Sequence, residues 1–246
     1  MTTRTNRLLA QVIAALQTQL TEFCANPGAL GHAGLDRLMC LVCETLHTVN
    51  APARGTPISF SDHLHHRELA LAQPHIRIAE PSGDDDTARP DRRLASTISD
   101  LLTALARRDL PDTVAAQSGA VRTIDHLRAT VLLCVDLALD TIGTAQPAAL
   151  AEAVRSLAVV LAERHPGQAI EVRVPPYAAV QVGAHEAGPA HTRGTPPNVV
   201  ETNPQAFLAL ATARLTWRQA IETGQLNRSG AHADEAGRMF PVLRLH

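Results

Sequence analysis

Thr130-Val-Leu-Leu-Cys-Val-Asp-Leu-Ala-Leu139 carries apolar side chains almost all the way round a helix of 3.6 residues per turn. A helix of this kind is buried on every side, so it must lie at the centre of other helices. Amphipathic helical patterns also occur at residues 9–23, 35–49 and 91–109. Together with residues 123–142 they predict a four-helix bundle over residues 1–143, with a long crossover connection.

The pattern of the sequence changes after residue 143. A helix is expected at 147–164, further helices begin at Asn203-Pro204 and at the capping box Thr216-Trp-Arg-Gln219, and 233–245 is a last helix. Short strands are expected at 169–174, 178–182, 198–202 and 225–229. Residues 147–246 are therefore predicted to form an α+β domain with a small, mostly antiparallel sheet, which makes the chain an α+β multidomain protein.

The composition excludes several classes of function. The chain has 246 residues, a formal net charge of −2 and 22 basic residues, all of them Arg. This charge excludes strong non-specific binding of nucleic acid, and the lack of Lys excludes Schiff-base catalysis. No run approaches the ~20 apolar residues of a transmembrane helix. Residues 1–7 lack the apolar stretch of a secretory signal, so a cytoplasmic location is expected.

The cysteines and several polar residues leave alternatives open. Cys24, Cys40, Cys43 and Cys134 lie in or beside apolar helical patterns and are expected to be reduced, buried thiols. The Cys40-x-x-Cys43 spacing also occurs in redox and zinc motifs, but a second such pair is missing.

His63-Leu-His-His66 is interpreted as scattered, solvated histidines, with a metal site as the alternative. Asp136 and Asp140 are expected to reach the end of the bundle or to pair with Arg122 or Arg128.

Several segments of the C-terminal region carry a recognisable pattern. They are Val172-Arg-Val-Pro-Pro-Tyr-Ala-Ala-Val-Gln181, His191-Thr-Arg-Gly-Thr-Pro-Pro-Asn-Val-Val-Glu-Thr-Asn-Pro204, Phe207-Leu-Ala-Leu-Ala-Thr-Ala-Arg-Leu-Thr-Trp-Arg-Gln-Ala220, Gly224 and Ser229-Gly230. With them, the chain from about Leu150 to Val242 resembles the actinobacterial sterol-carrier-protein-like family. The resemblance implies a sheet and covering helices that enclose an apolar pocket for a lipid or a fatty acyl chain.

The N-terminal half carries Ala120-Val-Arg-Thr-Ile-Asp-His-Leu127 and the spacing from Asp125 to Asp140. On these it resembles the helical domain of mycothiol-dependent maleylpyruvate isomerases. The resemblance implies a divalent metal held by a His on the second helix and a Glu-x-x-x-His pair on the fourth. The positions concerned are Leu41, Leu133 and Leu137. Because Leu has no donor atom, we expect no metal, no catalytic residue, no cofactor and an apolar, dry bundle centre.

The loop before residue 198 and the helices after it supply the candidate ligand-binding residues. They are His191, Arg193, Gly194, Thr195, Asn198, Phe207 and Trp217. Arg193 is suited to an anionic head group, with amide and hydroxyl donors beside it. Alternatively, Arg193 and Asn198 fasten the loop to the sheet, and the apolar side chains fill the core. The apolar side chains in question, which line a pocket in the first interpretation and fill the core in the second, are Phe207, Leu215, Trp217, Ile221, Phe240 and Leu243.

These patterns favour non-catalytic binding or carriage of an apolar or amphipathic small molecule by the second domain. The alternative is a thiol-dependent transferase or isomerase with displaced metal ligands. A third interpretation is an interaction protein whose pocket is filled by its own side chains. The sequence leaves the oligomeric state open, with a homodimer as one option.

Overall fold

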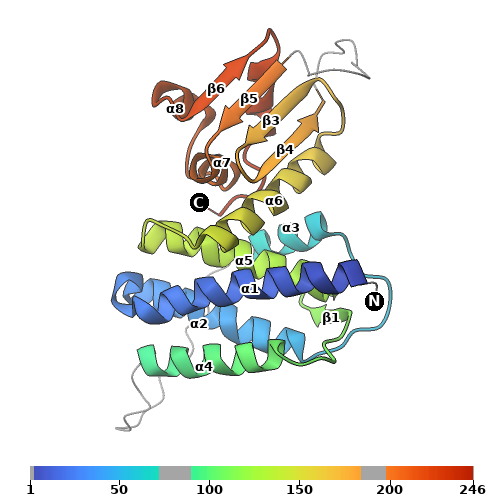
Figure 1. Ribbon diagram of the computed structural model, residues 1–246, viewed down its shortest axis with the longest axis vertical. Helices are drawn as coiled ribbons and strands as arrows, with labels where there is room; N and C mark the ends of the chain where they lie inside the picture. The colour runs from blue at the N-terminus through green and yellow to red at the C-terminus, as the bar shows by residue number, and fades with distance from the viewer. Residues whose placement is uncertain (1–2, 72–89, 184–197, 246) are drawn as a thin grey trace. The chain divides into compact units, whose positions relative to one another are not determined.

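The structure, a computed structural model, describes residues 3–71, 90–183 and 198–245. Its contacts divide the chain into two compact units, residues 1–152 and 153–246, whose elements are labelled in Figure 1. The first unit consists of helices and a β-hairpin, and the second contains a four-stranded sheet with helices. The predicted α+β multidomain fold is confirmed.

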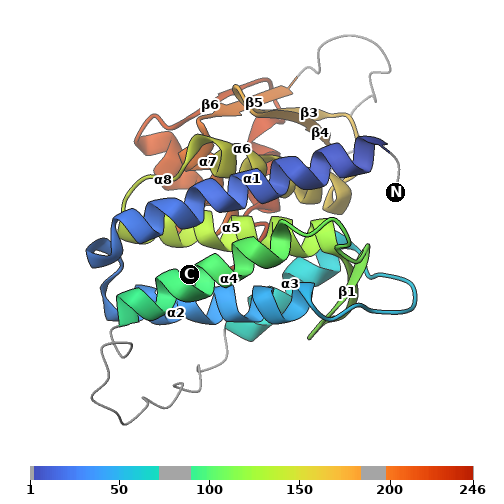
Figure 2. The ribbon, with the colours of Figure 1, turned by 60° about the horizontal axis from the view of Figure 1, so that its bottom comes forward.

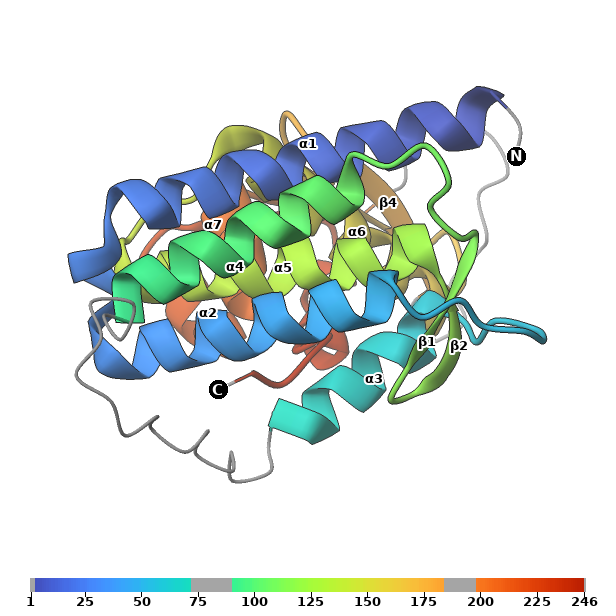
Figure 3. The same cartoon turned by 90° about the horizontal axis from the view of Figure 1, so that it is seen from below.

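Four long helices make up most of the first unit. They are α1 (Thr3–Ala25), α2 (Pro27–Val49), α4 (Pro90–Leu105) and α5 (Thr123–Thr141). Helices α1 and α2 both pack against α5, and α4 packs against α1 and α2, so the four run side by side in Figure 3. Every residue from Ala129 to Ala138 of α5 is buried. The all-round apolar stretch therefore forms the central helix, as predicted.

A short helix and a hairpin complete the first unit. Helix α3 (Phe60–Leu71) packs against α5, and β1 (Thr113–Ala116) pairs antiparallel with β2 (Gly119–Arg122). The sequence analysis missed this hairpin because strands of four residues are too short to show a clear alternation. The turn between the strands places Ser118 opposite α3, where its hydroxyl contacts His63.

The second unit is built on a mixed sheet. Its strands are β3 (Ile170–Val174), β4 (Ala178–Val182), β5 (Asn198–Thr202) and β6 (Leu226–Ser229), in the order β4-β3-β5-β6. Two of the pairings are antiparallel and β3–β5 is parallel, so the mostly antiparallel sheet is confirmed. Alternate residues of β3 are buried, and the helices α6 (Pro147–Arg164) and α7 (Pro204–Ala211) lie on one side of the sheet in Figures 1 and 2.

Local signals in the sequence explain the helix starts of the second unit. The Asn203 side chain accepts a hydrogen bond from the backbone N–H of Ala206 at the start of α7. A complete capping box of Thr216 and Gln219 begins α8 (Trp217–Glu222). Both helix starts agree with the sequence analysis.

The last predicted helix is wrong in type and length. Residues 233–245 were expected to be α-helical, but only Ala233–Met239 are helical, as a 3₁₀ helix (η2). Phe240-Pro241 follows, and Pro has no N–H to continue a helix. The tail instead donates the N–H groups of Val242 and Leu243 to the carbonyl oxygen of Ala211. The tail thus fastens η2 to the end of α7.

The structure corrects two further expectations in the helical unit. Only Cys134 is a buried thiol, because Cys24 and Cys43 are exposed and Cys40 is partly exposed. Asp136 and Asp140 lie 3.8 and 3.7 Å from the guanidinium of Arg37 on α2, a partner that the sequence analysis did not name. Asp140 does lie in the last turn of α5, at the end of the helix, as one of the two alternatives expected. The sequence could not show that α2 supplies the counter-ion. Among the described residues, no helix combines the length and hydropathy that a membrane-spanning segment requires.

Candidate functional site

The three positions aligned with metal ligands hold buried leucines. Leu41, Leu133 and Leu137 are all buried in the first unit. Their side chains carry no donor atom, so this part of the bundle interior is apolar, as expected. No group of three or more His, Cys, Asp and Glu side chains that could hold a metal ion occurs in the part of the chain that the structure describes.

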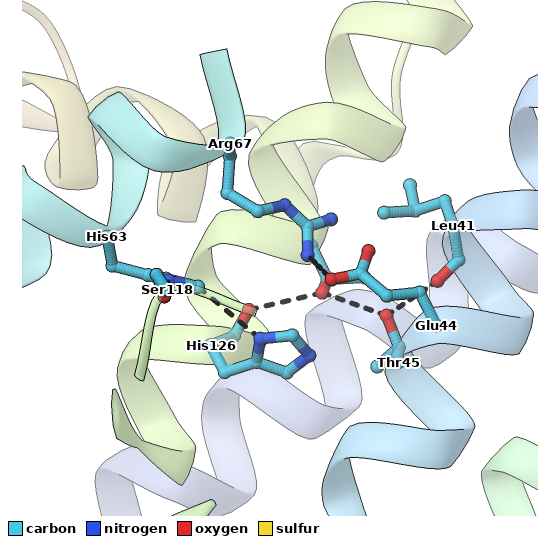
Figure 4. A network of polar contacts seen from close by, with 8 residues as sticks. Leu41, Glu44, Thr45, His63, Arg67, Ser118 and His126 are labelled. Atoms are coloured by element: carbon cyan, nitrogen blue, oxygen red, sulfur yellow. Dashed lines mark hydrogen bonds and ion pairs between the residues drawn. The ribbon is translucent and has the colours of Figure 1, made fainter. Parts of the chain in front are cut away.

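The expectation of a dry, apolar bundle centre is nevertheless wrong. One helical turn from Leu41 and Leu133, polar side chains from α2, α3, α5 and the hairpin turn meet inside the unit (Figure 4). We call this set the polar cluster, and its members are Glu44, Thr45, His63, Arg67, Ser118, His126 and Thr130. The polar cluster joins α3 to the bundle.

The charged part of the polar cluster is an ion pair between Arg67 on α3 and Glu44 on α2. Arg67 is buried, with 8% of its surface exposed, although a guanidinium is rarely buried without a partner. Beside it, the hydroxyl oxygens of Thr45 and Thr130 lie 3.1 Å apart. The Thr45 hydroxyl also lies 2.7 Å from the carbonyl oxygen of Leu41, and the Thr130 hydroxyl 3.1 Å from that of His126, each within reach to donate a hydrogen bond. The buried hydroxyls thus have hydrogen-bond partners inside the unit.

The uncharged part is a pair of neighbouring imidazoles, with ring centroids 5.4 Å apart and ring planes tilted by 46°. His63 Nδ1 lies 2.8 Å from the Ser118 hydroxyl, and His63 Nε2 lies 3.4 Å from His126 Nδ1. Burial lowers the pKa of His63 to about 4, with the Arg67 charge as a second cause. Burial also lowers the pKa of His126 well below its usual value. Both rings are therefore neutral at pH 7.

One buried side-chain atom of the polar cluster, Nε2 of His126, has no hydrogen-bond partner in the described part of the chain. The nearby Cys134 does not provide a nucleophile, because complete burial raises its pKa to about 12. The cluster thus offers neutral imidazoles and a neutralised ion pair, but no activated nucleophile.

The sequence analysis overlooked most of the polar cluster. The His63 side chain was expected to be solvated and is buried, whereas His65 and His66 are exposed. The signal that would have revealed the cluster is the i, i+4 spacing of His63 and Arg67, which places both on one face of α3. His126 gave no such signal, since its partner comes from another helix.

The predicted ligand-binding residues of the second unit are only partly visible. His191, Arg193, Gly194 and Thr195 lie outside the described residues. The side chain of Asn198 is buried, donates to the carbonyl oxygen of Ala169 at 3.0 Å and accepts from the backbone N–H of His232 at 2.9 Å. Its amide therefore fastens the start of β5 to the neighbouring segments.

The structure brings Phe207 and Trp217 together through a third ring. Phe240 packs edge-on against Phe207, with centroids 6.0 Å apart, and stacks on Trp217 at 5.9 Å. We call Phe207, Trp217 and Phe240 the aromatic cluster. Phe207 is fully buried, whereas Phe240 and Trp217 are partly exposed. The three rings thus form a continuous row of aromatic contacts from the core of the unit to its partly exposed edge.

A separate open depression of about 380 Å³ lies on the other side of the sheet, beside the turn between β3 and β4. Its lining is Arg173, Pro175, Pro176, Tyr177, Ala178, Ala179 and Glu201. Arg173 already donates a hydrogen bond of 2.8 Å to Glu171. Because the lining is shallow and its guanidinium is engaged, this depression is a weaker candidate than the aromatic cluster.

Comparison with known proteins identifies the C-terminal region. Residues 146–242 match the family model described as "Bacterial SCP ortholog", which confirms the resemblance of this region to sterol carrier proteins. No curated protein matches the chain.

Two solved structures are similar to the chain. One is described as a histidine-to-alanine mutant of the mycothiol-dependent maleylpyruvate isomerase, with 14% identity and a TM-score of 0.45 over 93% of this chain and 96% of that chain. The other is described as the same isomerase, with 15% identity and a TM-score of 0.40 over 87% of this chain and 93% of that chain. The sequence analysis expected the N-terminal half to resemble isomerases of this kind.

Proposed function

We propose that residues 147–246 form a domain that binds an apolar or amphipathic small molecule, such as a fatty acyl chain. The match of residues 146–242 to the sterol carrier family supports this proposal. In the same proposal, residues 1–143 form a non-catalytic helical domain, because Leu41, Leu133 and Leu137 replace the donor atoms that a metal would need.

The aromatic cluster is the observation that carries the proposal. Its rings extend from the buried Phe207 to the partly exposed Trp217. The indole of Trp217 lies flat against Gly237, where an added Cβ would come within 2.9 Å of the ring. A ligand that covers such a surface gains about 25 cal/mol for each Å² of apolar area removed from water. An acyl chain therefore finds an ordered apolar track here.

A polar head group requires a partner beside this track. We propose that Arg193, with His191 and the loop donors Gly194 and Thr195, binds a carboxylate or phosphate head. Asn198 follows this loop directly, and its two hydrogen bonds fix the start of β5.

Trp217 is the only Trp in the chain, so ligand binding can be followed by its fluorescence without labelling the protein. Excitation of the indole in the presence of a fluorescent polyene fatty acid should give energy transfer that saturates at micromolar concentration. An unlabelled long-chain fatty acid should reverse the transfer, and a short-chain acid should not. Phe240→Ala should weaken binding, because it removes the ring between Trp217 and Phe207.

The matched control is Phe60→Ala, which removes a buried Phe from α3 in the other unit. It should leave the fatty-acid affinity unchanged. Light scattering on the same samples gives the oligomeric state, from which the number of ligand molecules bound per chain is calculated. If the wild-type chain gives no saturable transfer, or if Phe60→Ala and Phe240→Ala weaken binding equally, the proposal fails.

The alternative function is a thiol-dependent transferase or isomerase with displaced metal ligands. The buried Nε2 of His126, which lacks a partner among the described residues, is the observation in its favour. Elemental analysis of the purified chain separates the two functions. One zinc ion per chain that is lost in His126→Gln would support the enzyme, and metal-free wild-type protein would exclude this version of it.

We also propose a cytoplasmic location. The four cysteines are free, and Cys24 and Cys43 are exposed. Exposed free thiols persist in a reducing compartment and oxidise outside it. Thiol titration of protein taken rapidly from cells should therefore find the exposed cysteines reduced.

A further inference from the structure

The outward face of α2 carries a row of side chains that ligate metals. Asp36, Cys40, Cys43 and His47 follow one another at spacings of four, three and four residues, which places them on one helix face. Asp36, Cys43 and His47 are exposed and Cys40 is partly exposed. The bundle holds the opposite face of α2, so packing does not explain this row.

The two thiols influence each other across one helical turn. Burial raises the pKa of Cys40, and the negative charges of Cys43, Asp36 and Glu44 raise it further. These negatively charged neighbours disfavour a thiolate at Cys40 that has no bound cation. The same negative charges attract cations, so they favour the binding of a metal cation that replaces the protons of the thiols.

Helix geometry disfavours a disulfide between these cysteines. Residues three apart on a helix hold their Cβ atoms about 5–6 Å apart. A disulfide needs Cβ atoms about 3.5–4.5 Å apart. Both cysteines lie well inside α2, far from its ends at Pro27 and Val49, so a bridge would distort the helix. We therefore expect the pair to remain a dithiol. A metal ion bound between the two sulfurs does not require the Cβ atoms to come as close as a disulfide does.

We propose that Cys40 and Cys43 form a surface site for a soft, thiophilic metal ion of low coordination number, of which Cu(I) is the type. Each thiol gives its proton to solvent, and each sulfur then donates an electron pair to the ion. Soft thiolate ligands favour Cu(I), zinc and iron–sulfur clusters over hard ions, and Cu(I) is the one of these that two sulfurs can hold. Zinc takes four ligands in structural sites, and the described residues contain no group of three that could hold a metal.

This site is distinct from the bundle interior and from the aromatic cluster. Its ligands lie on the solvent side of α2, whereas Leu41 lies on the buried side. The inference does not depend on ligand binding by the second unit. If the chain fails to bind fatty acid, the inference about the metal site therefore still stands.

The test uses the full, reduced chain under anaerobic conditions, with Cu(I) as the probe and a chromophoric Cu(I) chelator as competitor. The chain should withdraw one Cu(I) ion from the chelator, with an affinity that falls as the pH is lowered because two protons compete for the sulfurs. Cys40→Ser and Cys43→Ser should each weaken binding by more than about tenfold, since each removes a ligand outright.

Cys24→Ser is the matched control, because it removes another exposed thiol, on α1. It should leave the Cu(I) affinity unchanged, and thermal unfolding should confirm that all three variants fold. Equal losses in the three variants would mean independent thiols and would overturn the proposal. A loss in His47→Ala as large as in Cys43→Ser would overturn the two-coordinate assignment.

Discussion

Two neutral histidines inside the polar cluster make the stability of the chain depend on pH. His63 has its pKa lowered by burial to about 4, whereas an unfolded His has an ordinary value of 6.5. The unfolded state therefore binds a proton that the folded state does not bind between pH 6.5 and pH 4. The stabilisation from the neutral His63 is therefore fully present above pH 6.5. On acidification the free energy of unfolding should fall, by about 3 kcal/mol at pH 4 for this one residue.

His63→Gln should reduce this pH dependence, and urea denaturation at several pH values measures it. His65→Gln is the control, because His65 is an exposed neighbour on the same helix. It should leave the slope as in the wild type. Should the two variants show the same slope, the buried imidazole would not be the source of the acid sensitivity.

The ion pair of Arg67 and Glu44 explains why the polar cluster persists in a bundle. Burial acts against both charges, since it lowers the pKa of Arg67 and raises the pKa of Glu44. Each charge counteracts the effect of burial on the other. Removal of one partner from a buried pair typically costs about 3–5 kcal/mol, because the other is left unpaired. The pair thus fastens α3 to α2 in one orientation.

At the scale of elements, a contact between two glycines positions β3 and β4. Gly183, just after β4, lies so close to the turn after α6 that an added Cβ would come within 2.5 Å of the Pro166 carbonyl oxygen. Gly167 has a φ of 149° and would meet Gly183 in the same way. Gly183→Ala should therefore lower the free energy of unfolding by about 1–3 kcal/mol through steric overlap.

Thermal unfolding monitored by Trp217 fluorescence measures this loss of stability, because Trp217 lies in the second unit. Gly28→Ala is the control, because nothing lies within 4 Å of a Cβ added there, near the start of α2. It should leave the melting temperature of the second unit unchanged. If Gly183→Ala melts like the wild type, the turn after α6 must be free to move away from β4.

Elements with strong local signals could be predicted from the sequence. The all-round apolar pattern predicted α5, and Asn203 and Thr216 predicted the starts of α7 and α8 because caps act within a few residues. The hairpin β1–β2 and the polar cluster were missed. Ser118, His63 and His126 meet only when the hairpin, α3 and α5 pack together, and no pattern within one segment reports such a contact.

At the scale of the whole molecule, the boundary between the two units falls within α6. The sequence analysis placed it at residues 143–147, whereas the contacts assign residues up to Glu152 to the helical unit. Glu152 forms an ion pair with Arg128 on α5 of the same unit, with Nε 2.9 Å from Oε1. Helix α6 therefore contributes residues to both units.

Two core variants decide whether the units unfold as one. Leu16→Ala creates a cavity in α1 of the first unit, and Val172→Ala creates one in β3 of the second. Substitution of a buried Leu by Ala costs about 2–5 kcal/mol. If the units are separate domains, Leu16→Ala should shift a transition seen by circular dichroism but leave the Trp217 fluorescence transition in place. Val172→Ala should shift the fluorescence transition. A common shift of both signals by either variant would mean that α6 couples the units into one cooperative structure.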